Sequence, residues 1–288
     1  MRRLLLSLAA CVLLAACTAE PPTADPVAPL PDARPYEEPL DSPPDSSSGL
    51  EAPDEYGNEE PSATVAGQRR SIYDAPRAKV KCPMPAVGEG DEASMRRYME
   101  NLSACLDRLW ERELREVNLH FIPPERQFLR KRVRHPACGT MPLKGSDGTY
   151  CPAAGAYFIL LDDSRRPWQA WAATVIAHEY GHHVQYLTRI LDYQERMLAA
   201  ATTDRTKNLV TRRLELQAEC LAGVALHAMR AELPPWEEFR YLYTGSMPKK
   251  WATDHGRPST QYRWMRKGFR SGRPAACNTW SPPASSVT

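Results

Sequence analysis

Hydrophobic and polar residues follow a helical period in parts of the chain and a strand period in others. Residues 94–116 place apolar side chains three and four positions apart, which predicts an amphipathic helix. Residues 117–122 alternate and stop at two prolines, so a short strand is expected there. Residues 156–162 form a compact β-rich run. We therefore expect an α+β fold, mainly helical with a small sheet.

Three further segments have the apolar character of core helices. They are a helix that starts near Pro167 and includes residues 174–185, a second around 214–223, and an amphipathic one at 263–270. The β-rich run directly precedes the first of these helices. We expect it to be the edge strand of the sheet, free to pair with an extended peptide; the alternative is that it pairs only within the sheet.

The N-terminus has the pattern of an export signal. A positive start, Met1–Arg3, precedes a largely apolar run of thirteen residues that ends at Ala16, too short to span a bilayer. The sequence Leu-Ala-Ala-Cys at 14–17 resembles the lipobox of bacterial lipoproteins, which implies lipidation of Cys17. The alternative is an ordinary signal in which Cys17 is incidental. We expect an exported protein, lipid-anchored to the cell membrane or outer membrane and facing the periplasm or exterior.

Composition changes sharply after the signal. Residues 18–66 contain eleven of the 27 prolines and twelve acids against the single base Arg34, with no hydrophobic period. This favours a disordered acidic tether, or alternatively a tail that binds a partner. We expect a signal peptide at 1–17, the tether at 18–78 and one folded domain at 79–288.

The folded part is basic although the whole chain has a net charge of only +2. Residues 67–288 carry 34 Lys and Arg residues against 23 acids, a net charge of +11. A solvated basic surface explains this, and anionic partners or the acidic tether are alternatives. We expect no nucleic-acid partner, because no binding motif is present and the protein is exported.

Cysteine usage agrees with export. Apart from Cys11 in the signal and Cys17, six cysteines remain, and an even number in an exported protein predicts three disulfides among fifteen possible pairings. The pairing we expect first is Cys138–Cys151, which would close a Gly-rich loop. For the other four cysteines spacing leaves the pairing open, and we expect Cys82–Cys105 and Cys220–Cys277.

A histidine pair on the first core helix predicts a metal site. His178 and His182 are four residues apart, so both imidazoles project from one face, and Glu179 is one step round the helix. This is the H-E-x-x-H zinc arrangement, in which the glutamate can act as general base. The alternative is two core histidines and a surface glutamate, and the apolar run before them argues against it.

Catalytic zinc needs a third protein ligand, with water in the fourth position. Glu215 and Glu219 share a face of the helix around 214–223. One carboxylate could bind the metal while the other accepts a hydrogen bond from the outer nitrogen of a ligating histidine. The alternative is a solvated pair, which the apolar character of this helix disfavours.

Several motifs together resemble the bacterial putative neutral zinc metallopeptidase family over roughly residues 80–280. They are Ala-His-Glu-Tyr-Gly-His-His-Val-Gln (177–185), Glu-Leu-Gln-Ala-Glu-Cys-Leu-Ala-Gly (215–223), His-Gly from 255 and the cysteine motifs at 138 and 151. The resemblance implies a gluzincin-like, zincin-like fold with Glu215 as the third ligand, by analogy with thermolysin. The family usually has aspartate where this chain has Glu219, whose extra methylene lengthens the reach of the carboxylate.

His255 matches the family's His-Gly motif and is expected in a loop after the helical core. It either stabilises the oxyanion of the tetrahedral intermediate or has a structural hydrogen-bonding role. His183 lies off the ligand face and is expected to be structural.

The sequence therefore predicts a zinc metallopeptidase of the cell envelope, with one Zn²⁺ per chain and a peptide or protein substrate. His178, His182 and Glu215 would bind the zinc and Glu179 would be the general base. Two alternatives stay open: a non-catalytic, zinc-stabilised surface scaffold, and a zinc amidase that acts on a cell-wall component.

Overall fold

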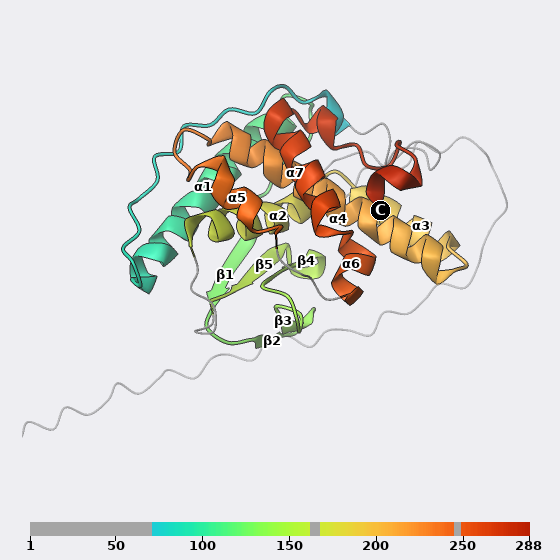
Figure 1. Ribbon diagram of the computed structural model, residues 1–288, viewed down its shortest axis with the longest axis horizontal. Coiled ribbons are helices and arrows are strands. Elements are labelled where there is room, and N and C mark those ends of the chain that lie inside the picture. The colour runs from blue at the N-terminus through green and yellow to red at the C-terminus, as the bar shows by residue number, and fades with distance from the viewer. Residues whose placement is uncertain (1–70, 162–167, 245–248) are drawn as a thin grey trace, which may run out of the picture. The chain divides into compact units, whose positions relative to one another are not determined.

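Helices pack beside a small sheet in this chain (Figure 1). A computed structural model describes residues 71–161, 168–244 and 249–288. The α-helices in these residues are α1 (Glu92–Arg115), α2 (Gln169–Leu187), α3 (Ile190–Ala200), α4 (Asp204–Ala228), α5 (Trp236–Tyr241), α6 (Lys249–His255) and α7 (Pro258–Ser271). The strands are β1 (Glu125–Leu129), β2 (Val133–His135), β3 (Gly139–Met141), β4 (Gly148–Cys151) and β5 (Ala156–Leu160). Four short 3₁₀ helices are η1 (Ser71–Asp74), η2 (Pro152–Ala154), η3 (Pro274–Cys277) and η4 (Ala284–Val287). The expected mainly helical α+β class is confirmed.

The strand that precedes the histidine-bearing helix is central, which corrects the expected edge strand. The sheet order is β1-β5-β4, with β5 parallel to β1 and antiparallel to β4. β5 is buried along nearly its whole length, as a strand covered on both faces requires. Within the described residues the edge next to α2 is therefore β4, while β2 and β3 pair as a separate hairpin.

The strand expected at 117–122 is absent from the structure. The chain leaves α1 through a turn in which Asn118 has φ 58°, and β1 begins only at Glu125. The sequence alternates because Val117, Leu119 and Phe121 pack against the hydrophobic core from a segment without ladder hydrogen bonds. Core contact alone therefore produced the period-two pattern.

The predicted helices form, with boundaries set by local capping. Asp91 caps α1 by accepting a hydrogen bond from the Ser94 backbone N–H at 3.1 Å. α2 begins at Gln169, and the expected start near Pro167 lies outside the described residues. α7 is the amphipathic helix expected around 263–270. It packs closely on α4 because Gly268 has no side chain: a β-carbon there would lie 2.0 Å from the Cys220 carbonyl oxygen.

The folded part begins before residue 79, so the expected domain boundary is too late. Ile72 in η1 and Ala78 are fully buried in the main core. The Ala78 backbone N–H also donates to the Gly272 carbonyl at 2.7 Å, which joins this segment to the end of α7. The packed N-terminal segment therefore reaches back at least to Ile72.

The three expected disulfides are present: Cys82–Cys105, Cys138–Cys151 and Cys220–Cys277. They join α1 to the segment before it, β4 to the turn between β2 and β3, and α4 to η3. Each bridge thus ties a loop to a core element.

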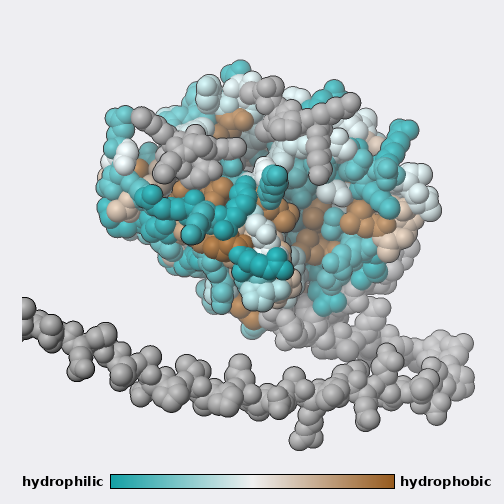
Figure 2. Space-filling model, turned by 90° about the horizontal axis from the view of Figure 1, so that it is seen from below, coloured by the Kyte–Doolittle hydropathy of each residue, from teal (hydrophilic) through white to brown (hydrophobic). Residues whose placement is uncertain are grey.

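The exposed large apolar side chains among the described residues are Ile122, Leu143, Trp168, Met197 and Tyr241. Figure 2 shows small hydrophobic patches interleaved with hydrophilic residues on the face seen from below. Among the described residues, no helix has both the length and the hydropathy needed to cross a bilayer. The expected signal peptide, the expected lipidation site Cys17 and residues 18–70 of the expected tether lie outside the described residues.

Candidate metal centre

Two helices bring three potential metal ligands together. α2 contributes His178 and His182, one turn apart, and α4 contributes Glu215. The Oε2 atom of Glu215 lies 3.3 Å from Nε2 of His178 and 3.4 Å from Nε2 of His182. All three ligand atoms are within 4.8 Å of one another. The structure thus places the predicted ligand set around one point.

The tautomers of both histidines follow from their outer nitrogens. Nδ1 of His178 lies 2.8 Å from Oε2 of Glu219, and Nδ1 of His182 lies 2.8 Å from the amide oxygen of Gln185. A carboxylate or amide oxygen accepts hydrogen bonds, so each Nδ1 carries the proton. In the neutral form that a metal requires, each imidazole then presents the lone pair of Nε2 toward Glu215.

In this form, lone pairs on Nε2 of His178, Nε2 of His182 and Oε2 of Glu215 face one another. Among the described residues, Oε2 of Glu215 is buried and has no hydrogen-bond partner, although imidazole nitrogens lie 3.3–3.4 Å away. A tetrahedral zinc site with bonds of about 2.0–2.1 Å separates its ligand atoms by about 3.3–3.4 Å. The observed nitrogen–oxygen separations of 3.3 and 3.4 Å match this spacing, so the residues fit Zn²⁺.

The electrostatics of the centre agree with a cation site. Burial lowers the pKa of His178, but the facing carboxylates of Glu215 and Glu219 outweigh burial and raise it well above its usual value. Burial raises the pKa of Glu215, while the charges of His255 and His182 lower it to well below its usual value. The centre therefore favours net positive charge beside Glu215, as protons or as a metal ion.

Glu179 lies between the metal residues and the edge strand β4. Its side chain is 6% exposed, and the Tyr150 backbone N–H donates to its carboxylate. A β-carbon on Gly148 would lie 2.6 Å from Oε1 of Glu179, so only glycine leaves room for the carboxylate at this point of β4. Burial raises the pKa of Glu179, which makes its carboxylate a better proton acceptor than an exposed one.

His255 is the last residue of α6 and not part of a loop, which corrects the expectation. Its Nε2 lies 3.3 Å from Oε2 of Glu215, and its Nδ1 lies 2.8 Å from Asp254. The imidazole stacks on Trp251 with the ring centres 3.6 Å apart. Within the described residues His255 does not belong to the mutually close ligand group, so it flanks that group beside Glu215.

His183 lies off the ligand face, as the spacing predicted. It is 2% exposed, its Nε2 lies 2.7 Å from the Ile122 carbonyl oxygen, and its Nδ1 lies 2.9 Å from the Tyr150 hydroxyl. Burial lowers its pKa to about 4, so the ring stays neutral. This histidine joins α2 to β4 and to the segment before β1.

Two series of hydrogen-bonded side chains support the histidines of the centre, and the sequence analysis did not predict them. The Tyr243 hydroxyl donates to the oxygen of Glu219 that does not face His178. Burial raises the pKa of Tyr243 well above its usual value, and the neighbouring carboxylate raises it further, so the hydroxyl remains a donor. On the other side, the Gln185 amide donates to the Leu214 carbonyl at 2.8 Å and to Gln217 at 2.9 Å.

The Gln217 amide continues this second series. It donates to the Tyr73 hydroxyl at 2.5 Å and to the Cys277 carbonyl at 3.3 Å, and it accepts from the Trp280 indole at 3.3 Å. Residues from both ends of the folded part thus support His182 indirectly. Only the glutamine in the motif at 177–185 could have suggested this, because the other partners are distant in sequence.

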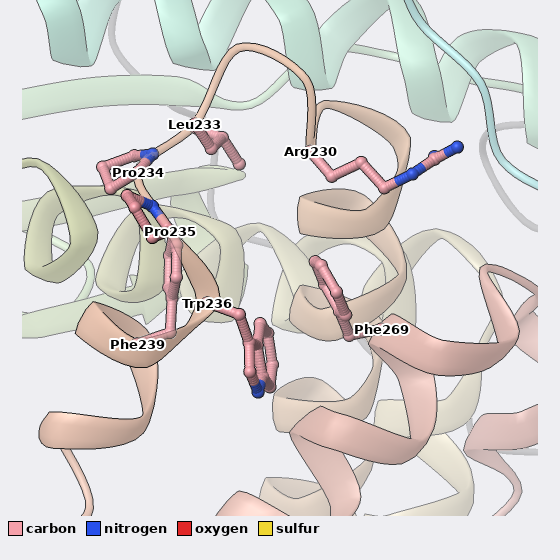
Figure 3. Close-up of a pocket in the computed structure, with 7 residues that line it drawn as sticks. All are labelled: Arg230, Leu233, Pro234, Pro235, Trp236, Phe239 and Phe269. Atoms are coloured by element: carbon pink, nitrogen blue, oxygen red, sulfur yellow. The ribbon is translucent and has the colours of Figure 1, made fainter.

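Among the described residues, neither a second group of possible ligands nor a pocket forms a further metal centre. His135 lies close to Cys138 and Cys151, but the two sulfur atoms are bonded to each other and are not thiolate ligands. A pocket of about 190 Å³ lies between the α4–α5 segment and α7, where Trp236 stacks on Phe269 (Figure 3). The lining of this pocket is Arg230, Leu233, Pro234, Pro235, Trp236, Phe239 and Phe269.

Comparison with known proteins is consistent with this site. The family model described as Putative neutral zinc metallopeptidase matches residues 60–238. The uncharacterized protein YpfJ of Escherichia coli K12 is 28% identical over 219 residues, which cover 66% of this chain and 72% of YpfJ. The uncharacterized protein Rv2575 of Mycobacterium tuberculosis H37Rv is 29% identical over 134 residues, which cover 37% of this chain and 43% of Rv2575. No solved structure shows significant similarity to the chain.

Proposed function

The chain belongs to the putative neutral zinc metallopeptidase family, and from this premise we propose that it hydrolyses peptide bonds with one Zn²⁺ per chain. His178, His182 and Glu215 are the proposed ligands. The observation that carries the proposal is the unpartnered Oε2 of Glu215, which faces both Nε2 atoms at tetrahedral spacing. The chemistry that zinc supplies in such a site is polarisation of the scissile carbonyl and a bound water with a pKa of about 7.

Glu179 is the proposed general base. Its carboxylate accepts the proton of the attacking water and passes it to the leaving nitrogen. The backbone N–H of Tyr150 orients the carboxylate, and the absence of a side chain at Gly148 leaves space for it. A closed structural zinc site would have no use for this carboxylate and would more often have four protein ligands.

The side of β4 that faces away from β5 is the proposed docking edge for the substrate backbone. An extended peptide that adds to this edge would use backbone hydrogen bonds, as in other β-strand additions. β4 contacts Glu179 through Gly148 and Tyr150, so a peptide along this strand would run beside the general base. We therefore propose β4 as the docking strand in place of β5, the strand before α2 for which this role was predicted.

His255 is proposed to support the oxyanion. Its Nε2 lies beside Glu215, and the Asp254 carboxylate fixes its ring by accepting from Nδ1. Stacking on Trp251 restricts the ring further. An imidazole held in this way can donate from Nε2 to a developing negative charge when that nitrogen is protonated.

The experiment compares the full chain with Glu179→Gln on a peptide library. We expect about one zinc per chain in both proteins and cleavage only by the parent, because glutamine keeps the shape but cannot take a proton. Equal cleavage by both would remove Glu179 as the base. Zinc in both without peptide cleavage would require assays on cell-wall fragments, where hydrolysis would favour an amidase and inactivity a binding scaffold.

We further propose that the protein is exported and lipid-anchored at Cys17, on the strength of the apolar run and the Leu-Ala-Ala-Cys sequence. Metabolic labelling with a fatty acid tests this. Label is expected in the parent and absent from Cys17→Ala. Equal labelling of both proteins, or none in the parent, would contradict the anchor.

A further inference from the structure

A tyrosine distant in sequence from every predicted ligand contacts the support of the metal centre. Tyr243 lies just after α5, which packs against α2. Its hydroxyl donates to Oε1 of Glu219 and also lies 2.9 Å from the sulfur of Met265. Neither Tyr243 nor its contact with Glu219 follows from the zinc-binding motifs, and residue 243 lies beyond the family match at 60–238.

Both oxygens of Glu219 are thereby used. Oε1 accepts from Tyr243, and Oε2 faces Nδ1 of His178 at 2.8 Å. The side chain of Glu219 is only 7% exposed, so water has little access to it. With a donor on each oxygen, the carboxylate plane is fixed, and the ring of His178 is fixed in turn.

We propose that Tyr243 is a positioning residue of the metal centre that acts through Glu219 to orient His178. This inference rests on the proposed zinc site. Without the hydroxyl, Oε1 of a buried carboxylate would lose its donor, and the carboxylate could rotate away from His178. Such a rotation would weaken the hydrogen bond that fixes the His178 tautomer with its Nε2 lone pair toward the metal.

Support of this kind has a measurable effect on metal affinity. Loss of an outer partner of a metal-ligating histidine typically lowers affinity by about 10–100-fold. Because Tyr243 is one step further out than Glu219, we expect the lower end of that range. Tyr262 offers a matched control, since its ring centre lies 5.7 Å from that of Tyr243 and its hydroxyl accepts from the Trp236 indole.

The test measures zinc affinity by chelator competition in the full chain. The variants are Tyr243→Phe, Tyr262→Phe, Glu219→Ala and the double variant of Tyr243 and Glu219. We expect Tyr243→Phe to lose about tenfold in affinity and Tyr262→Phe to match the parent. In the Glu219→Ala background the same tyrosine change should have no further effect, because the hydroxyl then has no carboxylate to hold.

A second readout follows the geometry at the metal. The visible spectrum of the Co²⁺-loaded protein should change in Tyr243→Phe and remain that of the parent in Tyr262→Phe. Loss of the Met265 contact alone would weaken affinity equally with and without Glu219, so the double variant separates packing from positioning.

The outcomes distinguish this proposal from the proposed function. Unchanged zinc affinity in Tyr243→Phe overturns the positioning role, and so does an equal loss in both backgrounds. A parent that binds zinc but cleaves no peptide contradicts only the peptidase proposal, since the affinity cycle can still be measured. A parent that binds no zinc contradicts the metal centre and this inference together.

Discussion

Gly181 of α2 lies so close to Ala218 of α4 that a β-carbon on it would be 2.8 Å from the Ala218 carbonyl oxygen and 3.0 Å from its α-carbon. The backbones of the two helices therefore meet at the glycine of the H-E-Y-G-H sequence. The contact lies within one turn of His178 and His182 on one helix and of Glu215 on the other. The close approach sets the separation of the ligands.

Gly181→Ala should push α2 and α4 apart. We expect a loss of zinc affinity of at least tenfold and a loss of stability of about 1–3 kcal/mol from overpacking. Chelator competition and thermal unfolding of the metal-free protein measure the two effects. Ala172→Gly, which weakens α2 by about 1 kcal/mol without adding bulk, is the control and should keep its zinc affinity. Parent-like affinity in Gly181→Ala would show that the close approach is unnecessary.

Gln185 should contribute to zinc affinity through His182. Its amide oxygen lies 2.8 Å from Nδ1 of the histidine, so Gln185→Leu removes the acceptor and should lower affinity by about tenfold. Gln185→Glu keeps an oxygen at this position and should retain more affinity than the leucine variant. Titration of both proteins with zinc checks the order, and equal affinities in leucine and glutamate variants would contradict the role.

Zinc affinity should fall as the pH falls. The carboxylates of Glu215 and Glu219 raise the pKa of His178 despite burial, and Glu215 likewise raises that of His182. Protons therefore compete with the metal even at pH values at and above the usual histidine pKa, and metal binding should release these protons. Chelator competition between about pH 8 and about pH 6 measures this, in the range where histidine titrates. Affinity that does not change over this range would contradict the ligand assignment.

His183 should make the folded state sensitive to acid. Burial lowers its pKa from 6.5 to about 4, so on acidification the unfolded chain binds a proton before the folded chain does. Stability should fall as the pH drops below about 6.5, with a total loss of about 3 kcal/mol near pH 4.

Denaturant unfolding with a chelator present isolates this effect from zinc release. His183→Gln lacks the titrating group, so its stability should decline less over the same pH range. The difference between parent and variant is the quantity to compare. Parallel declines in both proteins would contradict the account of His183.

Short-range patterns predicted much of the candidate site. The four-residue spacing of His178 and His182 places both rings on one helical face whatever the rest of the fold does. The same argument placed Glu215 and Glu219 on one face of α4. The even cysteine count predicted three disulfides, and the three pairings that we expected are those in the structure, although spacing alone left fifteen possible.

The features that the sequence did not predict depend on contacts between residues distant in sequence. The position of β5 in the middle of the sheet depends on its pairing with β1, which no local pattern encodes. The alternation at 117–122 reflects side chains that pack on the core without a neighbouring strand. Tyr243 reaches Glu219 across 24 residues of sequence, and Gln217 reaches Tyr73 across 144, so neither contact could be inferred before the helices were placed.

The metal content of the purified full chain tests the central claim most directly. Mass spectrometry of the parent, His182→Ala and Glu179→Gln would count zinc per chain. We expect about one zinc in the parent and in Glu179→Gln, and loss of zinc in His182→Ala, because one of three ligands is removed. A parent without zinc, or a full zinc load in His182→Ala, would contradict the metal centre of His178, His182 and Glu215.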